Sequence, residues 1–299
     1  MSLGGAPRRI LVTGATGFVG RRVVEQLLAE GDSVVALVRP GAAIREAERL
    51  TVAPCDLSGE ISAVLAKVGA TDCVVHLAQA PGWHDFPRTA GDIAALSVTA
   101  TCRLAEYACA VGASNLVYAS SGGVYGPATG PLVEGDPLKP AAELGFYLGA
   151  KAAAETLLGH FAGQLGVQIL RPFFLYGPGQ SPSFLMPRLL RSVAAGDAIR
   201  VAGGRGPKLN PLFVSDAARA VVAACRRAGS LTVNIAGDET ATLADIARMI
   251  GVMAGRDPVF DVIDEAPADY VADIGLMKSE LVPPSVGLQA GIRMAGGRS

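Results

Sequence analysis

Short apolar runs alternate with helical patterns along most of this chain, and that alternation restricts the possible fold more than any other feature. The runs are apolar at consecutive positions, which indicates strands that are covered on both faces. Strands of that kind, separated by helices, predict a doubly wound α/β fold with a parallel sheet. The predicted strands are residues 8–12, 33–38, 72–77, 115–119 and 167–170, and the predicted helices are 18–30, 93–111 and 146–165.

After residue 171 the loops grow longer, and the clearest patterns are helical, at residues 185–195, 216–227 and 243–254. We therefore expect a smaller, mainly helical C-terminal region that closes over the carboxyl ends of the strands. In open α/β sheets, that edge is where ligands bind.

Composition argues against several classes of function. The 299 residues carry a formal net charge of -1 with no block of like charge, so nothing indicates a surface for nucleic acid or membrane. The five cysteines are scattered and only three histidines occur, which predicts reduced thiols, no metal site and a cytoplasmic protein. The first residues contain no apolar run typical of a signal peptide, and no run reaches transmembrane length.

A glycine-rich segment, TGATGFVG at residues 13–20, joins the first predicted strand to the first predicted helix. Gly14 permits a tight turn, Gly17 lets the backbone approach a pyrophosphate, and Gly20 lets the helix pack closely on the strand. The helix N-terminus adds free amides and a positive dipole end. This corner predicts a Rossmann-type dinucleotide site.

Tyr147 and Lys151 stand four residues apart in a predicted helix, so their side chains share one face about one turn apart. A phenol has an ordinary pKa of about 10 and is a poor acid or base near neutral pH. An ammonium beside it favours the phenolate and brings it toward the working range. The pair alone is weak evidence, but here it follows a nucleotide loop and a Ser-Ser turn.

In this order the motifs resemble those of the extended short-chain dehydrogenase/reductases, the family that contains UDP-galactose 4-epimerase. The glycine spacing is Gly-x-x-Gly-x-x-Gly, and the likeness covers nearly the whole chain. It rests further on Asp56-Leu57, His76-Leu77-Ala78, the run SSGGVYG at residues 120–126, Tyr147 with Lys151, Arg171-Pro172, the run YGPG at residues 176–179, and the stretch 273–291.

The resemblance implies that Ser121, Tyr147 and Lys151 are the catalytic residues of an NAD(P)-dependent oxidoreductase or epimerase. Ser121 would donate a hydrogen bond to a substrate carbonyl, and Tyr147 would give or take the proton on that oxygen. Lys151 would lower the pKa of the tyrosine and bind the nicotinamide ribose. The expected cofactor contacts are Gly14, Thr16, Gly17, Phe18, Val19, Gly20, Arg39, Asp56, Leu57, Leu77, Ala78, Ala119, Tyr147, Lys151 and Pro172.

The same resemblance suggests the domain boundaries and the assembly. We predict a dinucleotide-binding domain of residues 1–171 and about 208–237, and a substrate-binding region of residues 172–207 and 238–299. Family members commonly pair two helices into a four-helix bundle, so we expect a homodimer.

The cofactor choice depends on the end of the second strand, where an acidic residue would bind the ribose of NAD. Val38 occupies that position and Arg39 follows it. A valine removes the repulsion of a 2′-phosphate, and a guanidinium can pair with that phosphate. We therefore favour NADP over NAD, and with it net reduction over epimerisation.

Family 4,6-dehydratases carry an acidic pair directly after the catalytic hydroxyl residue, whereas this chain has Gly122 and Gly123. Glycine transfers no proton, so elimination of water by that route is disfavoured. Reduction, oxidation and epimerisation through a transient ketone remain open.

The substrate side departs from the sugar-nucleotide pattern. Phe174 replaces an asparagine that often contacts the nucleotide phosphate, and Arg205 is one candidate to supply the lost charge. Trp83 would either stack on a sugar or base or cover the domain junction. The candidate substrate contacts are Gln79, Trp83, Ser121, Gly122, Phe173, Phe174 and Arg205.

Three functions follow from these observations. The first is a reductase or epimerase of a nucleotide-linked keto-sugar, as the whole-chain likeness implies. The second is a reductase of a smaller apolar ketone, as in flavonol-type or steroid-type relatives. The third is a non-enzymatic NADP sensor, which the intact Ser121, Tyr147 and Lys151 set disfavours.

Overall fold

A seven-stranded sheet forms the centre of the N-terminal part of the protein in a computed structural model that describes residues 6–297. The strand order is β11-β6-β5-β4-β1-β2-β3, and every neighbouring pair from β3 to β6 is parallel. The order reverses direction between β1 and β4, which makes that edge the ligand-binding switch point of a doubly wound sheet. The predicted α/β class is confirmed. The signal-peptide prediction falls partly on residues 1–5, outside the described residues.

The strands follow the apolar runs closely. They are β1 (Arg9–Thr13), β2 (Ser33–Val38), β3 (Leu50–Pro54), β4 (Cys73–His76), β5 (Asn115–Ala119), β6 (Gly166–Pro172) and β11 (Leu231–Ile235). Strands β4 and β5 are buried along almost their whole length because helices cover both faces. Strands β3 and β11, which lie at the two edges of the sheet, were not predicted.

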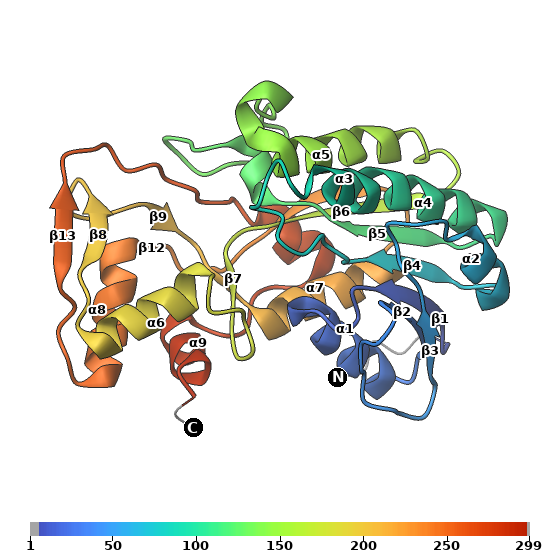
Figure 1. Cartoon of the computed structure of the whole chain (residues 1–299), viewed down its shortest axis with the longest axis horizontal. Coiled ribbons are helices and arrows are strands. Elements are labelled where there is room, and N and C mark those ends of the chain that lie inside the picture. Colours follow the sequence, from blue (N-terminus) through green and yellow to red (C-terminus); the bar gives the residue numbers. More distant parts are fainter. Residues whose placement is uncertain (1–5, 298–299) are drawn as a thin grey trace. The chain divides into compact units, whose positions relative to one another are not determined.

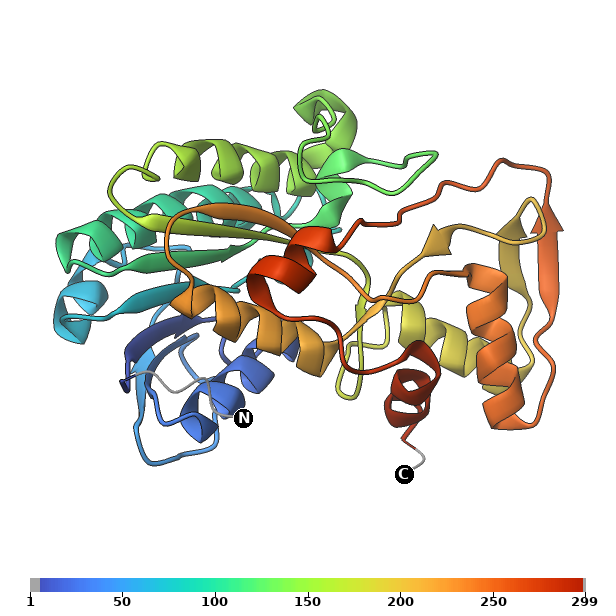
Figure 2. The same ribbon diagram turned by 180° about the vertical axis from the view of Figure 1, so that it is seen from behind.

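Helices cover both faces of this sheet (Figures 1 and 2). On one face lie α3 (Ala90–Ala94), α4 (Ala100–Ala110) and α5 (Ala141–Gly159), and on the other lie α1 (Phe18–Ala29) and α7 (Val214–Arg226). A shorter helix, α2 (Ser62–Val68), packs into the core on the side of α4 and α5, where Leu65, Leu104 and Leu158 are buried.

Two predicted helices differ in their bounds. A π-helical turn, η1 (Ala95–Thr99), links α3 to α4, so the segment predicted as one helix begins at Ala90. Helix α5 ends at Gly159 rather than at residue 165, and turns fill the remaining residues.

Contacts between Cα atoms divide the chain into two compact units. The first contains the segment up to Val124 together with Leu138–Arg171 and Ala218–Val233, and the second contains Tyr125–Pro137, Pro172–Ala217 and the segment from Asn234 onward. Helices of the second unit are α6 (Leu185–Ala195), α8 (Leu243–Ala254) and α9 (Leu288–Ala295). No helix within residues 6–297 has the length and apolar character needed to cross a membrane.

The second unit also contains paired strands, which the mainly helical expectation did not include. Strand β7 (Leu175–Tyr176) pairs with β10 (Leu212–Phe213), and β9 (Lys208–Leu209) pairs with β12 (Ala241–Thr242). A third pair joins β8 (Ile199–Ala202) to β13 (Phe260–Ile263). Helix α8 begins with a capping box in which Thr242 and Asp245 satisfy each other's backbone amides.

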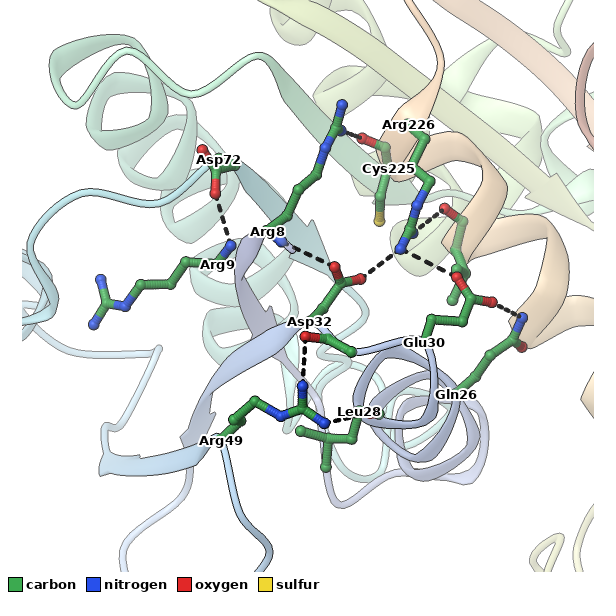
Figure 3. A network of polar contacts seen from close by, with 12 residues as sticks. Arg8, Arg9, Gln26, Leu28, Glu30, Asp32, Arg49, Asp72, Cys225 and Arg226 are labelled. Carbon is green, nitrogen blue, oxygen red and sulfur yellow. Dashed lines mark hydrogen bonds and ion pairs between the residues drawn. The ribbon is translucent and has the colours of Figure 1, made fainter. Parts of the chain in front are cut away.

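A polar network fastens the end of α7 to the corner between α1 and β2 (Figure 3). The Arg226 guanidinium lies 2.7 Å from an Asp32 carboxylate oxygen and 3.1 Å from a Glu30 oxygen. Asp32 is buried and also accepts from the Arg8 amide, while the Arg8 side chain donates to the carbonyl of Cys225. These contacts lie at the end of the sheet where β1 and β2 begin, away from the ligand-binding edge, so we assign them to stability.

Candidate active site

The glycine corner between β1 and α1 is closed by its own backbone. Gly14 has φ +69°, and a Cβ there would lie 2.7 Å from backbone atoms of Leu77 and Ala78. A Cβ on Gly20 would lie 2.0 Å from the carbonyl oxygen of Gly14. Gly17 caps α1 without a side-chain hydrogen bond, so the first turn of the helix keeps its amides for an anion. The corner fits a dinucleotide pyrophosphate because side chains are excluded from it.

A buried chain of hydrogen bonds positions the end of β4 beside this corner. The Ala78 amide donates to Thr13 Oγ1, which lies 2.7 Å from His76 Nδ1. His76 Nε2 lies 3.1 Å from the carbonyl oxygen of Leu96. Burial, together with the nearby Lys151 charge, lowers the pKa of His76 to about 3. The imidazole is therefore neutral, with the proton on Nε2, and it serves the scaffold rather than proton transfer.

Helix α5 presents Tyr147, Lys151 and Glu155 four residues apart, on one face. The face begins just after Gly145, whose φ of +71° lies outside the helical region, so the continuous helix starts beside Tyr147. The sequence motif identified the first two members. Glu155 was missed, and its spacing from Lys151 is the signal that could have found it.

Lys151 is buried against the carboxyl end of β5. Its Nζ donates to the carbonyl oxygen of Ala119 at 2.7 Å and lies 4.7 Å from the centre of the Tyr118 ring. The same nitrogen lies 5.9 Å from the centre of the Tyr147 ring. Burial lowers the pKa of Lys151 to about 8, while the Glu155 carboxylate opposes this shift. A lysine in this environment can change its charge near neutral pH.

Glu155 forms a buried ion pair with Arg171 of β6. The Arg171 guanidinium donates to both carboxylate oxygens, at 2.6 Å from Nη2 and 3.2 Å from Nε. The hydroxyl of Ser120, at the start of the Ser-Ser turn, also donates to Glu155. One carboxylate thus joins helix α5, which carries Tyr147 and Lys151, to strand β6 and to the turn after β5 that carries Ser121.

Ser121 lies in the turn that follows β5, and the 3-10 helix η2 (Gly122–Tyr125) begins directly after it. Its hydroxyl accepts from the Gly123 amide at 3.1 Å. The oxygen's proton therefore stays available for another acceptor, such as a carbonyl. A Cβ on Gly123 would lie 3.0 Å from the Leu148 side chain, so a larger residue at this position would require Leu148 to shift slightly.

Tyr147 is half-buried, and an aromatic side chain covers its ring. The ring centres of Trp83 and Tyr147 are 4.6 Å apart with an angle of 36° between their planes. Burial raises the pKa of Tyr147 above its ordinary value. This direction is opposite to the lowering that a neighbouring ammonium was expected to cause, and burial of the phenol is the cause of the rise.

The residues expected to determine the preference between NADP and NAD lie at the end of β2. Val38 is buried, Arg39 is exposed, and the Cys55 amide donates to the Val38 carbonyl. Asp56 is also exposed, and two hydrogen bonds from Ser58, helped by the Arg39 charge, lower the pKa of its carboxyl. An arginine and a carboxylate therefore both face solvent here, and Leu57 beside them is buried in the core.

The predicted substrate contacts of the second unit have different environments. Phe173 is buried with its ring centre 6.1 Å from that of Tyr125, so it belongs to the core of this unit. Phe174 is 37% exposed, packs edge-on against Tyr270 and has φ +40°, a conformation that costs a non-glycine residue about 1–2 kcal/mol. The Arg205 guanidinium pairs with Asp269 at 2.8 and 2.9 Å, which already matches its charge.

A family model for NAD dependent epimerases and dehydratases matches residues 10–236. The chain belongs to the NAD dependent epimerase/dehydratase family. It is therefore an enzyme of the extended short-chain dehydrogenase/reductase type, within the nucleotide-sugar branch, as the motifs predicted.

Several named proteins are similar to this chain over most of its length. UDP-glucose 4-epimerase of Mycolicibacterium smegmatis (strain ATCC 700084 / mc(2)155) is 31% identical over 243 residues, 74% of each protein. A Streptomyces 3-diazoavenalumate denitrifying reductase is 34% identical over 257 residues, 83% of each. The solved structure of MoeE5 in complex with UDP-glucuronic acid and NAD is 30% identical with a TM-score of 0.82, covering 97% of this chain and 98% of that one.

Proposed function

We propose that this enzyme is an NAD(P)-dependent oxidoreductase that acts on a nucleotide-linked keto-sugar, as a 4-ketoreductase or an epimerase. The observation that carries this proposal is the α5 face on which Tyr147 and Lys151 stand, anchored by Glu155 to the turn that carries Ser121. The similarity to MoeE5, whose structure contains a UDP-sugar and NAD, supports the substrate class.

The chain's own residues fit the dinucleotide. The Gly14, Gly17 and Gly20 corner would hold the pyrophosphate, Asp56 and Arg39 would face the adenosine half, and Lys151 would hold the nicotinamide ribose. The remaining predicted contacts, Thr16, Phe18, Val19, Leu57, Leu77, Ala78, Ala119 and Pro172, stay part of this proposal. When bound, the nicotinamide ring supplies or accepts the hydride.

Proton transfer would fall to Tyr147. Because burial raises the pKa of its hydroxyl, the side chain is protonated at neutral pH, which is the form that reduction of a ketone requires. Ser121 would donate to the same substrate oxygen and orient it. The Lys151 ammonium would compensate the charge left on the phenolate after the proton has moved. The protonated phenol therefore favours net reduction of a ketone as the direction of the reaction.

Arg39 is our reason for favouring NADP. We expect Arg39→Ala to weaken NADPH binding by about tenfold or more while it changes NADH binding little, because only NADPH carries the 2′-phosphate. Calorimetric titration of each cofactor into cofactor-free protein measures this difference. Arg45→Ala, an exposed arginine in the loop after β2, is the matched control. Equal losses for the two cofactors would remove Arg39 from the 2′-phosphate site.

The substrate class is tested by the nucleotide alone. We expect UDP or dTDP, in the presence of bound cofactor, to raise the melting temperature, because a ligand at about 100 times its Kd stabilises the native state by roughly 2.7 kcal/mol. AMP serves as the control for nucleotides that bind the cofactor site instead. An unchanged melting temperature with every nucleoside diphosphate and sugar conjugate would count against a nucleotide-sugar substrate.

A reductase of a smaller apolar ketone is the second candidate. Exposed Phe174 and its neighbour Tyr270 offer an aromatic surface in place of an amide, and one similar protein is named as a reductase of 3-diazoavenalumate. Turnover of flat aromatic ketones without turnover of keto-sugars would favour it. A homodimer, a cytoplasmic location and the domain boundaries 1–171 with about 208–237 remain predictions, as do the Gln79 and Gly122 contacts.

A further inference from the structure

An aromatic loop, residues 79–89, leads from β4 to α3 and covers the start of α5. We propose that Trp83 in this loop is a positioning residue for Tyr147, which fixes the orientation of the phenol and keeps water from one face of its ring. The ring centres of the two residues are 4.6 Å apart, at 36°. This inference rests on the proposed role of Tyr147 as the proton donor.

The aromatic loop is held by a second ring pair. Phe86 and Phe146 stack with their centres 5.2 Å apart and their planes at 24°, and they are 57% and 41% exposed. Phe146 directly precedes Tyr147 in α5, so successive residues of the helix each contact one ring of the loop. Two such contacts fix both the height and the rotation of the loop over the helix, and each aromatic pair contributes about 0.5–1.5 kcal/mol.

A tight turn aims Trp83 at the phenol. The carbonyl oxygen of Gly82 accepts from the Asp85 amide at 2.7 Å and from the Thr89 hydroxyl at 3.0 Å. Gly82 has φ +64°, and a Cβ there would lie 2.7 Å from an Asp85 carboxylate oxygen. These hydrogen bonds give the loop a defined turn at Gly82, directly before Trp83.

Two other groups lie near the phenol. Lys151 Nζ is 5.9 Å from the centre of the Tyr147 ring, and Tyr118 interacts electrostatically with Tyr147. On the aromatic loop, exposed His84 contacts Trp83 edge-on with ring centres 5.3 Å apart. Lys151 and Tyr118 approach from α5 and β5, so Trp83 is the contact that the loop itself contributes.

Trp83 is the single tryptophan of the chain, so intrinsic fluorescence reports on this contact directly. We expect Tyr147→Ala to increase quenching of Trp83 by acrylamide about twofold, because the indole loses the ring that shields one face. Tyr147→Phe keeps a ring at the same place and should leave quenching unchanged. Equal quenching in wild type and Tyr147→Ala would overturn the proposal.

Ultraviolet titration of the phenol tests the effect on Tyr147, with the spectrum of a matching Tyr147→Phe protein subtracted to isolate its signal. In Trp83→Ala we expect the Tyr147 phenol to ionise at lower pH than in wild type, because water reaches the ring and solvates the phenolate. Trp83→Phe should restore the wild-type curve. Arg88→Ala, a change at an exposed residue of the same loop that contributes to neither ring pair, is the matched control.

An unchanged titration in a folded Trp83→Ala or Trp83→Leu protein would overturn the positioning role. Where a substrate is turned over, Trp83→Ala should lower kcat by about tenfold or more, with a smaller change in KM, since the loss is one of orientation. The optical measurements need no substrate. If they succeed while no nucleotide sugar is turned over, the proposed function fails and the contact between Trp83 and Tyr147 stands.

Discussion

Tyr147→Phe should reduce turnover by about a hundredfold to ten-thousandfold, which is the range that general acid catalysis contributes. The substitution removes only the hydroxyl. The ring keeps its contact with Trp83, and Lys151 keeps its bond to the Ala119 carbonyl oxygen. We therefore expect cofactor affinity within about twofold of wild type, and the loss should fall on kcat.

Tyr125→Phe is the matched control, because this tyrosine belongs to the same SSGGVYG motif. Its hydroxyl donates to the Asn234 side chain at 2.8 Å, and the residue is buried. We expect a loss of about 1 kcal/mol in stability and near-normal turnover per folded molecule. Single-turnover kinetics at saturating cofactor separates the two variants. If Tyr147→Phe kept more than about a tenth of the wild-type rate, its role as the proton donor would be refuted.

The sheet could be predicted where its strands are buried on both faces. Strands β2 and β5 are nearly uniform apolar runs, and their observed bounds are the predicted ones. Strand β3 is mostly exposed and therefore lacks such a run. Strand β11 contains Asn234, a buried amide that donates to the Leu132 carbonyl. Exposure at the sheet edge and a buried polar side chain both make a strand hard to recognise, because the hydrophobic pattern is the main local signal for strands.

Parts of the candidate site could also be predicted from the sequence, and other parts could not. The glycine corner could be predicted because its requirement is local, and every participant lies within residues 13–20 except the β4 end that closes it. Glu155 could not be assigned a role, because its partner Arg171 lies 16 residues away on β6 and the pairing is tertiary. The contact between Trp83 and Tyr147 joins two segments 64 residues apart, so no local pattern predicts it.

Replacing Glu155 with glutamine should lower the free energy of unfolding by about 3–5 kcal/mol, because a buried arginine then loses its carboxylate partner. We expect a fall in melting temperature of roughly 10 °C. Glu143→Gln on the same helix is the matched control. Glu143 forms an exposed ion pair with Lys139 at 3.0 Å, and its loss should cost less than about 1 kcal/mol. Similar effects of the two substitutions would refute this prediction.

The same substitution should change the pH dependence of turnover. Burial lowers the pKa of Lys151 to about 8, and the Glu155 carboxylate holds it up against a further fall. Without that charge the pKa of Lys151 falls further, so the ammonium is lost at lower pH. The alkaline limb of the rate profile should therefore move to lower pH in Glu155→Gln and stay in place in Glu143→Gln. A merely structural ion pair would reduce the amount of folded enzyme and leave the limb unmoved. Movement of the limb would thus identify Glu155 as the residue that sets the charge of Lys151 beside Tyr147.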